Sequence, residues 1–253
     1  MASETLIISP HLDDAVLSAG AHLIGSDAPL VVTVFAGIPE EGAPPGWWDR
    51  LTRAADPAQR VRDRLLEDAA ALAELGARTV RLDGVDGQHR EHPVDPQRLA
   101  EELLPFVEAT DDLWIPAGIG NHQDHTAVRD AALIAHHAGG RGTTGGARSV
   151  HLYADVPYAI RYPWSGAPGA KDPDLLDAGF WLEEEMRRCG LSRWRLTAEW
   201  SVLPPAAGER KLRALARYRT QWDALEIGRT LAAEPDSLLR YELSWRYHGH
   251  HGA

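Results

Sequence analysis

Two short clusters of histidine and aspartate directly follow apolar runs of the sequence. The first cluster, Pro10-His11-Leu12-Asp13-Asp14, comes after Leu6-Ile7-Ile8. The second, His122-Gln123-Asp124-His125, comes shortly after Leu113-Trp114-Ile115-Pro116. Short apolar runs of this kind predict buried strands, and open α/β sheets bind ligands at the carboxyl ends of their strands. We therefore expect both clusters to meet at one edge of a sheet.

The residue types and spacing of these clusters predict a metal site. Residues three apart lie on one side of a helical turn, so His11 and Asp14 can reach one point while Asp13 projects beside them. Imidazole nitrogen and carboxylate oxygen ligate zinc at about 2.0 to 2.2 Å, but two ligands do not hold the ion. A further ligand is expected from the second cluster. The alternative is a set of helix caps and His–carboxylate pairs, which accounts for each cluster separately but not for both.

Together, the two clusters resemble the metal motifs of the zinc-dependent LmbE-like (PIG-L) de-N-acetylase family. That family includes N-acetylglucosaminyl-phosphatidylinositol deacetylases, deacetylases of mycothiol and bacillithiol assembly, and sugar deacetylases of antibiotic pathways. The resemblance extends to residues 64–68, 82–90, 153–158 and 211–221. Ala15 stands where the family often has glutamate. In having a small residue at this position, the sequence resembles the antibiotic-pathway members.

The resemblance, with the ligand types, implies that His11, Asp14 and His125 ligate zinc and leave positions open for water and an acyl carbonyl. Zinc lowers the pKa of a bound water to about 7 and polarises the carbonyl. Iron in the cell is an alternative, because an N,N,O site accepts both metals.

Other residues of the motifs are expected to carry the proton transfers and bind the substrate. Asp13 is the expected general base, which later protonates the leaving amine. His122 is expected to stabilise the oxyanion, with Asp124 holding its ring and favouring the imidazolium form. The resemblance alone implies that Arg64 and Asp86 contact substrate hydroxyls.

The predicted reaction is hydrolysis of an N-acetyl or other N-acyl group on an amino sugar such as N-acetylglucosamine, in a small-molecule glycoconjugate of antibiotic biosynthesis. One alternative is a metal-dependent hydrolase of another amide or ester. A second is a Rossmann-like binding module without catalysis, which is disfavoured because no Gly-x-Gly-x-x-Gly follows Leu6-Ile7-Ile8.

Alternating strand and helix patterns predict an α/β fold with a Rossmann-like, mostly parallel sheet flanked by helices and the metal site at its carboxyl edge. We expect one domain over residues 1–253, with 238–253, including Trp245 and three histidines, as a flexible tail. Predicted strands cover 6–9, 30–35, 79–82, 113–116, 149–155 and 196–203, and predicted helices cover 14–23, 57–75, 95–107, 126–137 and 208–225. Leu65, Leu66 and Leu72 recur at helical spacing in the second helix.

Composition narrows the classes of partner. The net charge of −11 opposes binding to nucleic acid or to anionic lipid. A single cysteine, Cys189, excludes an intramolecular disulfide and an all-thiolate metal site. The absence of a signal-peptide pattern and of a long apolar span predicts a cytoplasmic protein, and a homo-oligomer stays open.

Two long loops, 37–48 and 158–179, are expected to shape the substrate pocket. In the first of them, Trp47 and Trp48 can either stack on a sugar or anchor the loop.

Overall fold

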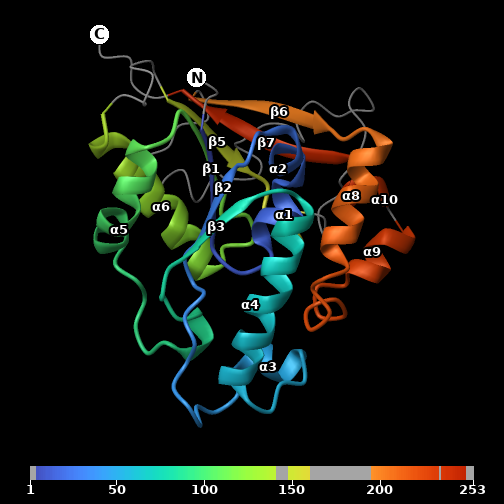
Figure 1. Ribbon diagram of the computed structural model, residues 1–253. Helices are drawn as coiled ribbons and strands as arrows, with labels where there is room; N and C mark the ends of the chain where they lie inside the picture. The colour runs from blue at the N-terminus through green and yellow to red at the C-terminus, as the bar shows by residue number, and fades with distance from the viewer. Residues whose placement is uncertain (1–3, 141–147, 160–194, 234, 249–253) are drawn as a thin grey trace.

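A sheet with helices on both faces organises the chain (Figure 1). The computed structural model describes residues 4–140, 148–159, 195–233 and 235–248. Within these residues the sheet has seven strands in the order β3-β2-β1-β4-β5-β7-β6. They are β1 (Thr5–Ser9), β2 (Leu30–Thr33), β3 (Arg78–Arg81), β4 (Asp112–Pro116), β5 (Ser149–Tyr153), β6 (Leu196–Val202) and β7 (Tyr241–Tyr247).

The first five strands in sequence are parallel, which confirms the predicted mostly parallel α/β sheet. Strand β7 runs antiparallel to both β5 and β6. The chain fills the sheet outward from β1, with β2 on one side and β4 on the other. A reversal of strand order at this point opens a crevice at the carboxyl ends of β1 and β4, the usual ligand position in such sheets.

Two groups of helices cover the sheet (Figure 1). Leu6 and Ile8 of β1 pack into the core beneath α5 and α6, whereas Ile7 packs beneath α1, α4 and α8 on the other face. This alternation follows from the two-residue period of a strand. The described helices are α1 (Asp14–Ser18), α2 (Gly20–Gly25), α3 (Trp47–Leu51), α4 (Pro57–Glu74), the 3₁₀ helix η1 (Gly87–His89), α5 (Pro96–Glu108), α6 (Gln123–Ala138), α8 (Pro205–Leu215), α9 (Ile227–Ala233) and α10 (Pro235–Leu239). None of the helices described meets the length and hydropathy of a membrane span.

Capping residues set the starts of the two long predicted helices α4 and α5. Asp56 and Asp95 each accept a backbone N–H of the first turn, and a proline follows each of them. Proline at this position loses no intrahelical hydrogen bond, so these starts were predictable. The apolar stripe predicted for α4 is correct in part: Leu72 is buried as expected, but Leu66 is 72% exposed, and Arg64 and Asp68 are buried. Arg64 lines the pocket at the carboxyl edge of the sheet, and Asp68 pairs with Arg81, the last residue of β3.

The predicted helix 14–23 is divided into α1 and α2 at Ala19, and the predicted helix 208–225 ends at Leu215. Lys211 of α8 explains the division. Its Nζ donates to the carbonyl of Leu17 at 2.9 Å, and its side chain lies so close to Gly20 that a Cβ there would meet it at 2.9 Å. Glycine at this position therefore makes room for a buried lysine between the two helices.

The expectation of a flexible tail over 238–253 is wrong for the stretch that forms β7. Tyr241, Leu243, Trp245 and Tyr247 alternate with more polar residues, and these four side chains are buried. Their two-residue period lets β7 pair with strands on both sides while it contributes to the core. Residues 249–253, with the last two histidines, lie outside the described residues.

Candidate metal and active site

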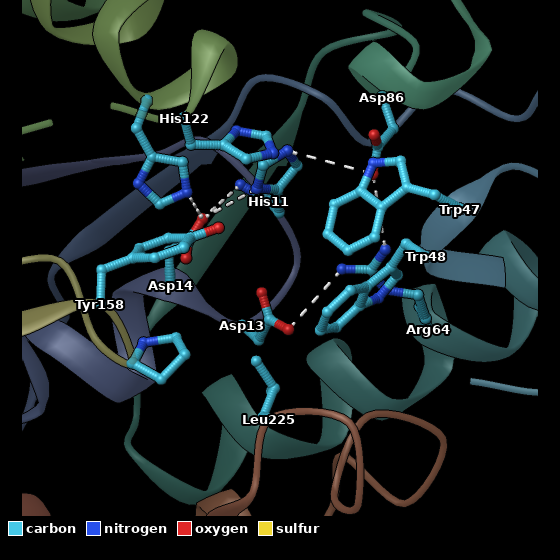
Figure 2. A pocket seen from close by; sticks show the side chains of 12 residues that line it. His11, Asp13, Asp14, Trp47, Trp48, Arg64, Asp86, His122, Tyr158 and Leu225 are labelled. Carbon is cyan, nitrogen blue, oxygen red and sulfur yellow. Dashed lines mark hydrogen bonds and ion pairs between the residues drawn. The ribbon is translucent and has the colours of Figure 1, made fainter. Parts of the chain in front are cut away.

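A pocket at the carboxyl edge of the sheet contains residues from both histidine clusters (Figure 2). The first cluster follows β1, and the second reaches the pocket from the loop after β4 and the first turn of α6. All the predicted site residues except Asp124 line it, and Asp124 contacts His11 from behind. The lining residues are His11, Asp13, Asp14, Trp47, Trp48, Arg64, Asp86, His122, His125, Pro157, Tyr158 and Leu225.

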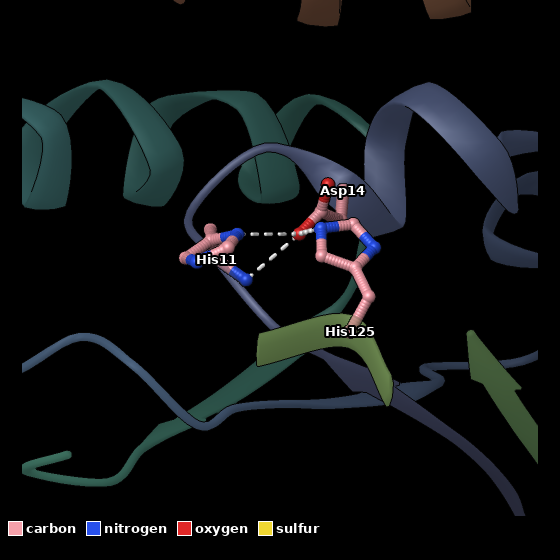
Figure 3. Close-up of side chains that lie close together, drawn as sticks. All are labelled: His11, Asp14 and His125. Carbon is pink, nitrogen blue, oxygen red and sulfur yellow. Dashed lines mark hydrogen bonds and ion pairs between the residues drawn. The ribbon is translucent and has the colours of Figure 1, made fainter. Parts of the chain in front are cut away.

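His11, Asp14 and His125 point their ligand atoms at one place (Figure 3). Oδ2 of Asp14 lies 3.2 Å from Nδ1 of His11 and 3.4 Å from Nε2 of His125. Ligands about 2.1 Å from a common tetrahedral centre lie about 3.4 Å apart, so these separations fit a small divalent cation. Two nitrogens and one oxygen also leave further coordination positions for water and substrate, as catalytic sites require.

The start of α1 sets the position of the Asp14 carboxylate. Its Oδ2 accepts the backbone N–H of His11 at 2.8 Å. Ser9 fixes the same turn, because its hydroxyl donates to the carbonyl of His11 and accepts the N–H of Ala15. The ligand geometry is therefore built by local hydrogen bonds of the strand–helix turn.

Asp124 holds the ring of His11, so the expectation that it holds His122 is wrong. Its Oδ2 lies 3.0 Å from Nε2 of His11 and accepts the backbone N–H of Gly87 at 2.9 Å, while Oδ1 pairs with Arg90. Because Asp124 lies in the first turn of α6, its side chain turns back beneath His11. The alternative metal group of His11, His122 and Asp124 is less suitable because the Asp124 carboxylate already pairs with the guanidinium of Arg90 and accepts the N–H of Gly87.

His122 caps α6 and is neutral, contrary to the expected imidazolium. Its Nδ1 accepts the backbone N–H of Asp124 at 3.3 Å. Burial, with the neighbouring His11 and His125, lowers the pKa of His122 to about 4. A neutral ring that accepts at Nδ1 carries its proton on Nε2.

Asp155, which was not among the predicted site residues, orients the third ligand. Its Oδ1 lies 2.6 Å from Nδ1 of His125, and its Oδ2 accepts the backbone N–H groups of Gly118 and Ile119 at 2.7 and 2.8 Å. Carboxylates in this position commonly fix the ring of a metal-bound histidine. The available signal was a carboxylate directly after β5, at the edge where the other ligands gather.

Asp13 stands beside the three ligands but outside their group. Burial raises its pKa to about 6, against the opposing effect of Arg64, whose Nη2 lies 3.7 Å from Oδ2 of Asp13. The other terminal nitrogen, Nη1, lies 3.9 Å from Oδ2 of Asp86. The predicted pair Arg64 and Asp86 thus shares one wall of the pocket with the expected base.

The carboxylates around the two histidine ligands favour positive charge at this point. Burial alone would lower the pKa of His11, but hydrogen bonds with Asp124 and Asp14 outweigh it and raise the pKa well above its ordinary value. Burial likewise opposes the charge on His125, whose pKa is raised by Asp14 and Asp155. A divalent cation would use the same negative surroundings after displacing those protons.

Comparison with known proteins identifies the family. The model of the PIG-L family, GlcNAc-PI de-N-acetylase, matches residues 6–136, more than half of the chain. The chain belongs to the PIG-L family. A search of the curated proteins found no match.

Solved structures agree with this assignment. The zinc-inhibited form of the teicoplanin deacetylase Orf2 is 25% identical, with a TM-score of 0.68 and 99% of this chain and 100% of that chain covered. The A40926 pseudoaglycone deacetylase Dbv21 is 28% identical, with a TM-score of 0.63 and the same coverage. The 4-carboxy-2-hydroxymuconate hydratase GalB from Pseudomonas putida KT2440 is 16% identical, with a TM-score of 0.58 over 99% of this chain and 98% of that chain, and shares the fold alone.

This PIG-L member is a hydrolytic N-deacetylase. Its His11, Asp14 and His125 fit a divalent metal. Most of the loop predicted at 158–179 lies outside the described residues, so the described pocket wall ends at Pro157 and Tyr158.

Proposed function

We propose that this deacetylase removes the N-acetyl or a longer N-acyl group from the amino sugar of a glycosylated natural-product intermediate of the glycopeptide class. The family and the similarity to the teicoplanin and A40926 deacetylases support the substrate class. The observation that carries the reaction is a group of two histidines and one aspartate with a second carboxylate, Asp13, beside it and free of the ligand role.

Asp13 is the proposed general base. With a pKa of about 6, its carboxylate is mostly ionised near neutral pH and can accept a proton from an attacking water. The same group then delivers that proton to the nitrogen of the leaving amine. A bound divalent cation, zinc or iron, would polarise the amide carbonyl and acidify the water.

His122 is the proposed donor to the carbonyl oxygen. Because Nδ1 accepts the N–H of Asp124, the proton of this pocket-lining ring is on Nε2, which is the atom that would donate. A neutral donor aimed at oxygen stabilises the negative charge that develops there during attack. Arg64 and Asp86 are proposed to bind hydroxyl groups of the sugar, as a guanidinium donor and a carboxylate acceptor.

Metal content and acetate release test this proposal together. We expect the reconstituted wild type to hold about one divalent ion per chain and the His11→Ala, His125→Ala double variant to hold none. The Asp13→Asn variant should keep the metal and lose about 10²- to 10⁴-fold in kcat on an N-acetyl amino sugar. Asp112→Asn, at the opposite end of β4, is the control and should keep both properties.

Two results would contradict the proposal. A reconstituted wild type without metal would remove the predicted metal group, and full activity of Asp13→Asn with bound metal would remove the proposed base. Release of acetate from esters but from no N-acetyl sugar would assign a different substrate class.

A further inference from the structure

Trp47 presents a large apolar surface at the mouth of the pocket. It is 52% exposed and lines the pocket beside Trp48. Leu51, one turn later on α3, is similarly exposed at 54% but is not a lining residue. Exposed apolar surface that continues into a pocket commonly marks a ligand contact, and an indole supplies much of it.

Helix α3, which carries Trp47, is held by the loop that carries Asp86. Oε1 of Gln88 accepts the backbone N–H groups of Trp48 at 2.9 Å and Asp49 at 3.3 Å. The buried carboxylate of Asp49 accepts the N–H of Gly46 at 2.9 Å and lies 3.0 Å from Nε2 of His89. A five-residue helix is unstable alone, so these contacts determine where Trp47 stands relative to Asp86.

Trp48 has the anchoring role that the sequence left open for either tryptophan. Its Nε1 donates to Oε1 of Gln221 at 2.6 Å, and its ring meets the ring of Trp47 edge-on at 5.3 Å. Trp48 therefore fixes α3 to the segment that follows α8 and supports the neighbouring indole. The packing of the described residues accounts for Trp48, whereas the same residues leave Trp47 52% exposed.

We propose that Trp47 is the stacking platform for the pyranose ring of the substrate. Figure 2 shows Trp47, Asp86 and Arg64 along one side of the pocket, with Tyr158 and His122 on the other side. A pyranose has an apolar face of C–H bonds, which suits the negative face of an indole, and a rim of hydroxyls, which suits a carboxylate and a guanidinium. N-acetylethanolamine, which is acyclic and carries a single hydroxyl, has neither the ring face nor the rim of hydroxyls. The inference rests on the proposed function and names the part of the substrate that this wall selects.

Binding, measured without turnover, tests the platform. The Asp13→Asn protein is loaded with zinc and labelled with ¹⁵N at its tryptophan indoles, and Trp47→Phe assigns the Trp47 signal. We expect the methyl glycoside of N-acetylglucosamine to shift this signal saturably and N-acetylethanolamine to leave it in place. In the same background, Trp47→Ala should weaken binding of the glycoside about 3- to 10-fold and Trp47→Phe about twofold, because a phenyl ring keeps part of the stack.

The matched control is Leu51→Ala, which removes equally exposed apolar surface from the same helix outside the pocket and should leave the affinity unchanged. Saturable binding of the glycoside without a shift at Trp47 would overturn the platform, as would equal weakening by Leu51→Ala and Trp47→Ala. If the glycoside does not bind at all, the pyranose assignment is wrong. Acetate release by the wild type tests the proposed deacetylation separately. If acetate is released but the outcomes above are found, only the role of Trp47 is wrong.

Discussion

Oδ1 of Asp155 lies 2.6 Å from Nδ1 of the metal ligand His125, and both residues are buried. With Nδ1 engaged by Asp155, Nε2 of His125 faces Asp14, so this nitrogen is directed toward the predicted metal position. Asp155 is held in turn by two backbone N–H groups, so the ring orientation is determined before any metal binds.

Asp155→Asn should therefore weaken metal binding while the fold persists. The amide has the same shape, but it removes the negative charge that favours the ligating tautomer and the positive metal. We expect an affinity loss of about 10- to 100-fold. A metal titration monitored by competition with a chelating dye measures it, with Asp95→Asn at the cap of α5 as the control. Unchanged affinity in Asp155→Asn would show that the backbone alone orients His125.

The ligands were predictable because they interrupt apolar patterns. His11 and Asp14 follow a buried strand at helical spacing, and His125 lies in a second cluster of the same kind. Asp155 was missed because it stands alone after β5, without another ligand-type residue beside it. Its role depends on the pairing of β5 with β4, which brings it next to His125 and which no local pattern expresses.

The orientation of α4 and the role of β7 show the same limit. The apolar spacing of α4 predicts the helix but places Leu66 on its buried side, whereas Leu66 is exposed and Arg64 is buried at the pocket wall. In β7 the two-residue period was present in the sequence, but proximity to the chain end favoured a tail. Asp13 and Arg64, in contrast, were both predicted near the site, and their electrostatic coupling required the structure.

Arg64→Met should shift the acidic limb of the kcat/KM profile to higher pH. Burial raises the pKa of Asp13 to about 6, and the guanidinium of Arg64 opposes this rise. Removing the cation raises the pKa further, so a larger fraction of Asp13 is protonated and inactive at pH 6. A shift of about one pH unit is expected for loss of one nearby opposite charge.

A bound divalent cation lowers the pKa of Asp13 in both proteins, so the difference between their profiles is the quantity to measure. The control is Arg62→Met. Arg62 lies on α4, as Arg64 does, but it is exposed and pairs with Glu41, so its loss should leave the acidic limb in place. Superimposable profiles for Arg64→Met and the wild type would exclude this coupling. A loss of kcat/KM that is equal at every pH would instead assign Arg64 to substrate binding alone.

Metal affinity should fall as pH decreases from 8 to 6. The pKa values of His11 and His125 are raised, so protons compete with the metal at both rings up to higher pH than for ordinary histidines. Where both rings are protonated, the apparent affinity should fall about 100-fold per pH unit, and binding should release about two protons. Calorimetry in two buffers with different ionisation enthalpies measures this release. Release of no protons at pH 6 would contradict the raised values.

The same two histidines should affect the stability of the metal-free protein in the opposite direction as pH changes. A histidine whose pKa is raised in the folded state stabilises the fold below its unfolded pKa of about 6.5. This contribution is lost as pH rises through the folded value. We therefore expect the stability that His11 and His125 contribute to the metal-free protein to fall from pH 6 to 8, whereas the stabilisation by zinc, measured as the difference between loaded and chelated protein, should rise. Urea unfolding at both pH values, with and without chelator, provides the comparison.

The buried pair Lys211 and Glu242 replaces one hydrogen bond of a helix. In a continuous helix the N–H of Ala21 would donate to the carbonyl of Leu17. Here Lys211 donates to that carbonyl at 2.9 Å, and Oε2 of Glu242 accepts that N–H at 3.0 Å. The two charged groups lie 2.5 Å apart, so each is both paired and bonded to the backbone.

Lys211→Met should destabilise the fold by about 3 to 5 kcal/mol, because it leaves the Glu242 carboxylate buried without its counter-charge. The double variant Lys211→Met, Glu242→Gln should recover part of this loss, since the amide still accepts the N–H of Ala21 and carries no charge. Urea unfolding measures both values. Arg213→Met breaks the exposed pair with Glu74 and should leave the free energy of unfolding almost unchanged. A Lys211→Met protein as stable as Arg213→Met would show that the buried pair does not stabilise the fold.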